Sequence, residues 1–71
     1  MEQKERTEKL TSRELQVLKM IAGGFNDEEI SQVLGISATY IRTNLVNGML
    51  KRAGVVNRPS LIFWATQNGV I

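Results

Sequence analysis

A turn of only three residues, 35–37, separates two segments that both carry the apolar spacing of helices. Apolar residues recur at third or fourth positions on both sides of it: Ile30, Val33 and Leu34 come before the turn, and Ile41, Leu45 and Met49 follow it. A connection this short forces two helices to cross steeply, and the small Ser31 allows them to approach closely. The stretch therefore predicts a helix-turn-helix.

The rest of the chain shows the same pattern of helix starts and stops. Thr11 and Glu14 have the spacing of a capping box, and Asn26 and Glu29 repeat it. The caps and stops together predict helices from 12 to about 22, between 26 and 35, from 38 to about 53, and from 58 to near 68–69. No segment alternates apolar and polar residues over a strand's length, so we expect an all-α, four-helix fold without strands.

We expect the core to be built from one apolar stripe on each helix: Leu15, Leu18, Ile21, Ala22, Ile30, Val33, Leu34, Ile41, Leu45, Met49, Leu61, Ile62 and Ala65. Residues 1–9 are rich in charge and poor in apolar side chains, which predicts a flexible tail before a helix-turn-helix domain at 10–71. Met1 followed by a solvated tail favours a complete small protein. The tail also has no apolar run of the kind that a signal peptide or membrane span needs, so we expect a cytoplasmic protein.

Composition excludes several classes of function. The chain contains no cysteine and no histidine, which rules out disulfides, thiolate or imidazole metal sites and the commonest general base. We therefore expect no cofactor, no metal and no enzymatic activity.

Charge is divided unevenly, because residues 1–29 hold all seven acids whereas residues 30–71 hold four of the nine bases and no acid. An acid-free half of this kind favours a polyanionic partner.

Short motifs follow one another along the chain in a fixed order. They are Leu-Thr-Ser-Arg-Glu at 10–14, Val-Leu at 17–18, Ile-Ala at 21–22, Gly24, Asn26, Glu-Ile at 29–30, Leu34, Ile-Ser at 36–37, Ile-Arg at 41–42, Gly-Val at 54–55 and Asn-Arg at 57–58. Over residues 10–71 this set resembles the DNA-binding domain of LuxR-type response regulators. The resemblance implies that the third helix enters the major groove of double-stranded DNA and that the fourth helix pairs two subunits in a homodimer.

The same resemblance assigns site residues by position. Base edges would be faced by Arg42, Thr43 and Val46, and phosphates by Ser37, Tyr40, Asn44, Asn47 and Lys51, with Thr39 on the same outward face. Arg42 is either a DNA contact or an ordinary solvated arginine; we favour contact, because a guanidinium can bind guanine O6 and N7 through two hydrogen bonds. The expected dimer contacts are Phe63, Trp64 and Gln67, although Trp64 can instead wrap around the core.

The chain departs from the family mainly in charge. Asp27 and Glu28 stand where lysine is common, and they suit a helix start but would repel a nearby phosphate. Asn44 and Val46 stand where other members often carry a cationic side chain. These changes favour a second hypothesis from another class, a protein-interaction module such as an anti-activator that binds another transcription regulator. The acid-free half opposes it, so a sequence-specific DNA-binding transcription regulator remains our first hypothesis.

Two further departures concern the third helix itself. Gly48 lies inside the predicted helix, where glycine costs about 1 kcal/mol relative to alanine. The segment 51–53 also makes this helix one residue longer than is typical of the family.

Overall fold

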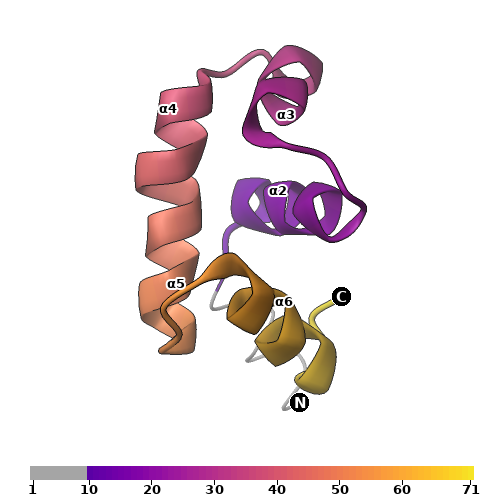
Figure 1. Ribbon diagram of the computed structural model, residues 1–71, viewed down its shortest axis with the longest axis vertical. Helices are drawn as coiled ribbons and strands as arrows, with labels where there is room; N and C mark the ends of the chain where they lie inside the picture. Colours follow the sequence, from indigo (N-terminus) through magenta and orange to yellow (C-terminus); the bar gives the residue numbers. More distant parts are fainter. Residues whose placement is uncertain (1–9) are drawn as a thin grey trace.

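Four helical stretches joined by short turns make up residues 10–71, the part of the chain that the computed structural model describes (Figure 1). The elements are α2 (Ser12–Ala22), α3 (Asp27–Leu34), α4 (Ala38–Tyr40), η1 (Ile41–Val46), α5 (Asn47–Ala53) and α6 (Arg58–Gln67). The elements α4, η1 and α5 run on without a break, and we call them together the long helix, residues 38–53. No strand occurs within residues 10–71, and the expected all-α fold is confirmed. The tail predicted at 1–9 lies outside the described residues.

The long helix is covered along one side only. In Figure 1 it stands upright, and α3, α2 and α6 lie one below another beside it. Contacts join α3 to α4 and η1, α2 to η1, and α6 to α5, so each of the other helices packs against a different level of the long helix. This arrangement leaves the opposite side of the long helix facing outward.

Side-chain caps set the helix starts as predicted. Glu14 donates its backbone N–H to the Thr11 hydroxyl at 3.0 Å, and its carboxylate accepts the Thr11 N–H at 2.9 Å. Asn26 and Glu29 form the same reciprocal pair at 2.8 and 2.9 Å. At the other end of α3, Gly35 takes the left-handed conformation, with φ of 72°, that other residues rarely adopt. The chain therefore leaves α3 abruptly and enters the long helix within three residues, which confirms the helix-turn-helix.

The core lies where α2, α6 and the long helix meet. Its buried apolar side chains are Leu10, Val17, Leu18, Ile30, Ile41, Leu45, Val46, Met49, Leu61, Ala65 and Val70. The predictions that Val33 and Ala22 are core residues are wrong, since Val33 is 63% exposed and Ala22 is also exposed. The short α3 lies at one end of the molecule and is covered on a narrow strip of its surface, which Ile30 occupies, so the flank with Val33 faces outward (Figure 1).

The middle of the long helix is π-helical, from Ile41 to Val46. In this geometry backbone hydrogen bonds join residues five apart instead of four, so a side chain five positions after Ile41 is brought over it. Val46 is consequently only 2% exposed and belongs to the core beside Leu45. The expectation that Val46 faces outward is wrong because it assumed α-helical spacing throughout.

The glycine inside the long helix faces a buried carboxylate. Glu14 is 3% exposed, and besides its capping hydrogen bond it forms an ion pair with Arg52 of α5. A Cβ atom added at Gly48 would lie 3.2 Å from the Glu14 Oε2 atom, closer than most side-chain contacts allow. Gly48 therefore permits α2 to bring its carboxylate against the long helix.

We predict that Gly48→Ala fails to give the stabilisation that this substitution normally brings inside a helix. The usual gain is about 1 kcal/mol, but here the new methyl group must displace a carboxylate that two partners hold. In a Glu14→Ala background the methyl group has room, and the full gain should return. Urea unfolding of the wild type, the two single variants and the double variant measures how much Gly48→Ala changes the free energy of unfolding in each background. Equal gains in the two backgrounds would contradict the role assigned to Gly48.

Candidate nucleic-acid interface

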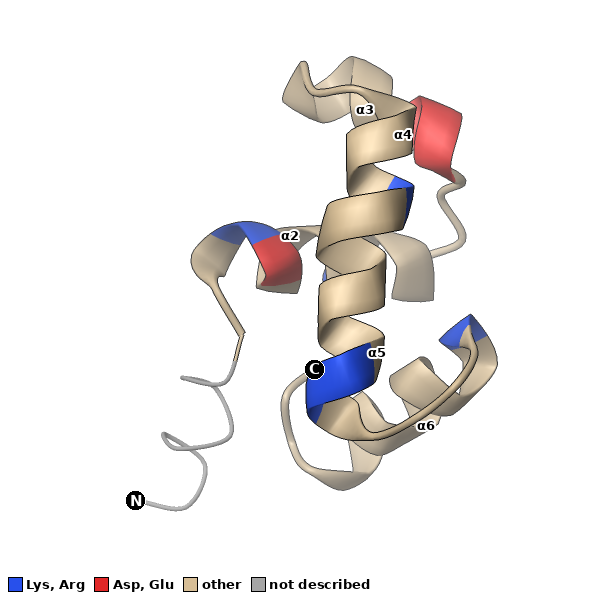
Figure 2. Ribbon diagram, turned by 90° about the vertical axis from the view of Figure 1, so that its left-hand side faces the viewer, with Lys and Arg blue, Asp and Glu red and all other residues tan. Residues whose placement is uncertain are grey.

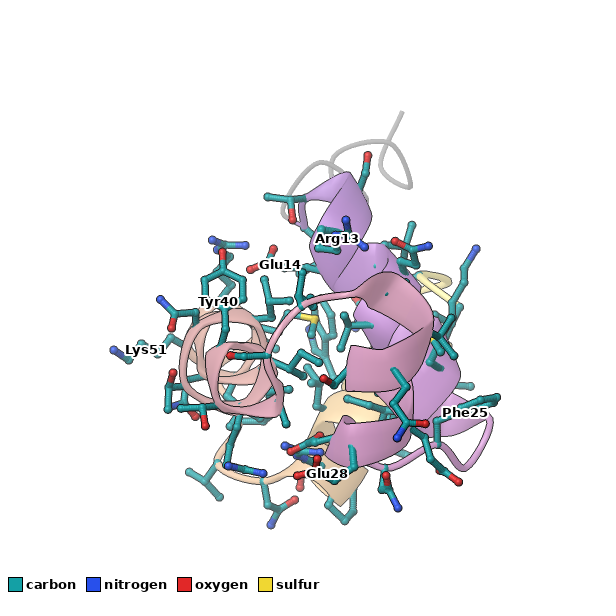
Figure 3. The ribbon with its side chains drawn as sticks, turned by 90° about the horizontal axis from the view of Figure 1, so that it is seen from above. Arg13, Glu14, Phe25, Glu28, Tyr40 and Lys51 are labelled. Carbon is teal, nitrogen blue, oxygen red and sulfur yellow. The ribbon has the colours of Figure 1, made fainter. Side chains whose placement is uncertain are left out.

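The uncovered side of the long helix, with the turn before it, carries a row of polar side chains, which we call the polar face. Its members are all exposed: Ser37, Thr39, Tyr40, Arg42, Thr43, Asn44, Asn47 and Lys51. In Figure 3, which looks down the long helix, the Lys51 side chain projects outward on the side turned away from α2 and α3. Every residue expected to contact DNA is thus accessible in the fold, except the buried Val46.

Hydrogen bonds within the helix occupy some of these polar groups. The Ser37 hydroxyl accepts the Tyr40 N–H at 2.9 Å and so caps the long helix. The Thr43 hydroxyl lies 2.8 Å from the Thr39 carbonyl oxygen and 2.8 Å from Asn44 Oδ1. Within residues 10–71, the Tyr40 hydroxyl and the Asn47 amide group have no such partner, so both are available to an external ligand.

A buried carboxylate lies at one edge of the polar face. Asp27, the first residue of α3, is 8% exposed and accepts two hydrogen bonds from Arg58, at 2.7 Å from Nη1 and 2.9 Å from Nη2. Arg42 donates a third from Nε, with the Nε and Oδ2 atoms 3.2 Å apart. Asp27 therefore connects α3 to η1 and to the start of α6. We call these three residues the Asp27 cluster.

The cluster also shifts the pKa values of Asp27 and Arg58. The hydrogen bond from Arg58 is the largest cause that lowers the pKa of the Asp27 carboxyl, and the positive charges of Arg58 and Arg42 act in the same direction. Partial burial opposes them without reversing the shift. The carboxylate raises the pKa of Arg58 in return. Asp27 is consequently ionised at neutral pH, and the cluster carries one net positive charge.

The Asp27 cluster corrects two sequence-based expectations. Arg42 is exposed as expected, with 53% of its side chain accessible, but it is not a free cation because Asp27 pairs with it. Asp27 is not a solvent-facing acid that would repel phosphate, since it is buried and doubly paired. No local pattern joins these residues, because Arg42 is 15 positions from Asp27 and Arg58 is 31 positions from it.

Three of the four cationic side chains in residues 30–71 are therefore paired inside the fold, and the two acids that pair with them neutralise half of their segment's positive charge. Arg42 and Arg58 pair with Asp27, and Arg52 pairs with Glu14. The two acids belong to the first 29 residues of the chain. Lys51 makes no ion pair with any of the described residues. Figure 2 shows the acidic first turn of α3 beside the long helix, with the basic end of α5 at the opposite end of that helix. The polar face is thus less positive than the charge division in the sequence indicates.

Comparison with known proteins identifies the helix-turn-helix. A family model described as "Bacterial regulatory proteins, luxR family" matches residues 8–65, which include α2, α3, the whole long helix and most of α6. The chain belongs to the luxR family of bacterial regulatory proteins. The resemblance inferred from the sequence motifs is thereby confirmed.

Individual relatives agree with this assignment. Two curated relatives, from Vibrio campbellii and Vibrio parahaemolyticus, are each described as an HTH-type transcriptional regulator MalT. Each is 40% identical over 60 residues, which is 84% of this chain but 6% of the relative. The chain thus spans a small part of their length. No solved structure matches, and none of the helices in residues 10–71 is long and apolar enough to cross a membrane.

The last helix of this luxR-family domain offers an exposed aromatic group. Phe63 on α6 is 66% exposed, and Gln67 one turn later is also exposed. Trp64 differs from them, because it is partly buried and packs against the core. Of the three dimer contacts expected from the sequence, Phe63 and Gln67 present their side chains to solvent, whereas Trp64 also supports the fold.

We predict that the Asp27 cluster makes stability depend on pH at the acidic end. A carboxyl group whose pKa is lowered by folding stabilises the folded state above its unfolded pKa, and this contribution disappears as the pH falls through the lower folded value. Asp27→Asn should therefore lower the free energy of unfolding by roughly 1–3 kcal/mol at neutral pH, with both arginines partly solvated. The difference between the two proteins should shrink once the pH falls below about 4.

Urea unfolding from pH 7 down to pH 2 measures this dependence. Glu28→Gln is the matched control, since it removes the neighbouring, exposed acid of the same helical turn. This control should cost less stability at neutral pH than Asp27→Asn does, because Glu28 forms no ion pair with the described residues. A pH-independent effect of Asp27→Asn would show that the charge of Asp27 does not stabilise the fold.

Proposed function

We propose that this chain is a sequence-specific DNA-binding transcription regulator that acts as a homodimer and reads DNA with the long helix. The observation that carries the proposal is the polar face, an uncovered row of hydrogen-bonding side chains on the second helix of a luxR-family helix-turn-helix. The relatives from Vibrio are described as transcriptional regulators, which supports the same class of function. Binding to DNA would also place the protein in the cytoplasm.

Different members of the polar face would have different roles. Arg42 keeps its two terminal nitrogens free of partners within residues 10–71, so it can donate to a base edge while Nε stays bonded to Asp27. Thr43 would offer its methyl group to a thymine methyl, because its hydroxyl is engaged inside the helix. The remaining groups would contact phosphates and position the helix: Ser37, Thr39, Tyr40, Asn44, Asn47 and Lys51.

A salt titration against random and selected duplexes tests the proposal. Selection from a randomised duplex library first identifies a preferred sequence, and binding is then measured between about 50 and 200 mM salt. A DNA-binding domain should prefer the selected duplex and lose affinity as salt rises, with a modest slope because Arg42, one of the two cations of the polar face, is paired with Asp27. A slope near zero together with no preference would contradict the proposed function.

One observation favours a second candidate, a module that binds another transcription regulator. Arg42, Arg52 and Arg58 are all paired with acidic side chains, which weakens the attraction for a polyanion. Such a module would keep the luxR-family fold and bind protein instead of DNA. The salt titration separates the two candidates, because only the DNA-binding domain shows a preferred duplex.

The homodimer would form through α6. Phe63 is large, apolar and 66% exposed, and a two-fold axis beside α6 would place this side chain against its own copy. Such a dimer would present two long helices to two half-sites, which raises affinity without additional charge on each subunit.

We predict that Arg42→Ala and Lys51→Ala weaken DNA binding in different ways. Loss of Arg42 should cost roughly 1–3 kcal/mol on the selected duplex and relax the preference at one base position. Loss of Lys51 should weaken all sequences alike and reduce the salt slope by about one. Repeating the library selection with each variant measures both effects. An unchanged preferred sequence and affinity for Arg42→Ala would exclude the proposed docking of the long helix.

We also predict that Phe63→Ser converts the dimer to a monomer while leaving the fold intact. Analytical ultracentrifugation measures the association, and circular dichroism measures the helix content. Val33→Ser is the matched control, because Val33 is similarly exposed, at 63%, but lies on α3. Trp64→Ala is expected to destabilise the fold as well, since Trp64 packs on the core. A wild-type protein that stays monomeric even on a duplex with two half-sites would disprove the dimer.

A further inference from the structure

We infer that Asp27 is a positioning residue for DNA recognition, which holds the Arg42 guanidinium so that its two terminal nitrogens face a base edge. The inference rests on the proposed function and adds to it an acidic residue that selects sequence without contacting DNA.

The bond between Asp27 and Arg42 uses one particular donor. Arg42 binds the carboxylate through Nε alone, with Nε and Oδ2 3.2 Å apart. Its Nη1 and Nη2 groups have no partner within residues 10–71, and 53% of the side chain is exposed. The edge formed by these two nitrogens is one that can donate a pair of parallel hydrogen bonds to guanine O6 and N7. Asp27 thus binds only Nε, which the contact with guanine does not require. The edge formed by Nη1 and Nη2 stays free for the base.

The acceptor in this bond is itself immobile. Asp27 begins α3 directly after the cap at Asn26, is 8% exposed, and is held by both terminal nitrogens of Arg58. A free arginine has many rotamers, and ordering it on DNA carries an entropic cost. A fixed carboxylate at Nε removes much of that freedom before DNA arrives. Arg42 therefore meets the groove with its orientation already restricted.

The negative charge of Asp27 lowers the affinity of the polar face for DNA of any sequence, although the same side chain orients Arg42. Removing the carboxylate would raise the local charge near the polar face by one unit, which attracts phosphates of any sequence. A positioning role thus predicts that Asp27→Asn weakens discrimination between duplexes while affinity for random DNA stays equal or increases at low salt. A residue that only supported the fold would weaken both in proportion.

The experiment measures the ratio of dissociation constants for random and selected duplexes, with the duplex selected by the wild-type protein. Asp27→Asn should lower this ratio by about tenfold, as expected when one arginine loses its alignment on a base. Glu28→Gln is the matched control, since it makes the same change of charge at the next residue, which has no bond to Arg42. The control should show the same gain for random DNA and keep the wild-type ratio.

A second variant guards against loss of folding. Asp27→Glu keeps the charge and an acidic helix start, but its extra methylene displaces the carboxylate, so it should lower the ratio several-fold in a protein with wild-type helix content. In an Arg42→Lys background, where no guanidinium remains to be oriented, Asp27→Glu should have no further effect on the ratio.

The outcomes separate this inference from the proposed function. A wild-type protein without any preferred duplex would overturn both. If the wild-type protein has a preferred duplex but the ratio of dissociation constants is unchanged in both Asp27→Asn and Asp27→Glu, the positioning role alone is overturned. A proportional loss on random and selected duplexes, in a folded Asp27 variant, would also overturn it.

Discussion

The buried carboxylate of Asp27 holds together the elements that form and support the polar face. It begins α3, and it binds Arg42 of η1 and Arg58 at the start of α6. A carboxylate removed from water must replace its lost hydration with hydrogen bonds, and Arg58 supplies two of them while Arg42 supplies a third. Asp27 therefore ties α3 to both the long helix and α6, in addition to the apolar core that packs them together.

Glu14 repeats the same principle at another level of the long helix. Its carboxylate caps α2 and pairs with Arg52 of α5, and Gly48 leaves the space in which it lies. The two buried acids together take up Arg42, Arg52 and Arg58. Acids from the first part of the sequence thus form ion pairs with arginines from the second part. These pairs join different helices, and they leave the surface less positive than the sequence of the second part indicates.

This pairing changes how DNA binding would work in this chain. With the three arginines of residues 30–71 paired to acids, attraction of this part of the chain to phosphates contributes less than in a highly basic domain, so correct alignment of Arg42 and the use of two subunits contribute more. Asp27 then has a double role under the proposed function, because it lowers general affinity while it orients the side chain that discriminates. The same low charge is what a protein-binding module would have, and for this reason the preference for a selected duplex decides between the two candidates.

The sequence by itself determined the helices, the turn between α3 and the long helix, and membership of the luxR family. Capping boxes such as Thr11 with Glu14, and a left-handed glycine such as Gly35, act within a few residues and need no tertiary contact. Only the tertiary structure decided which charges meet, because Glu14 and Arg52 are 38 positions apart and Asp27 and Arg58 are 31 apart. It also decided that Val46 is buried, since a π turn moves a side chain to a different face from the one that α-helical spacing assigns.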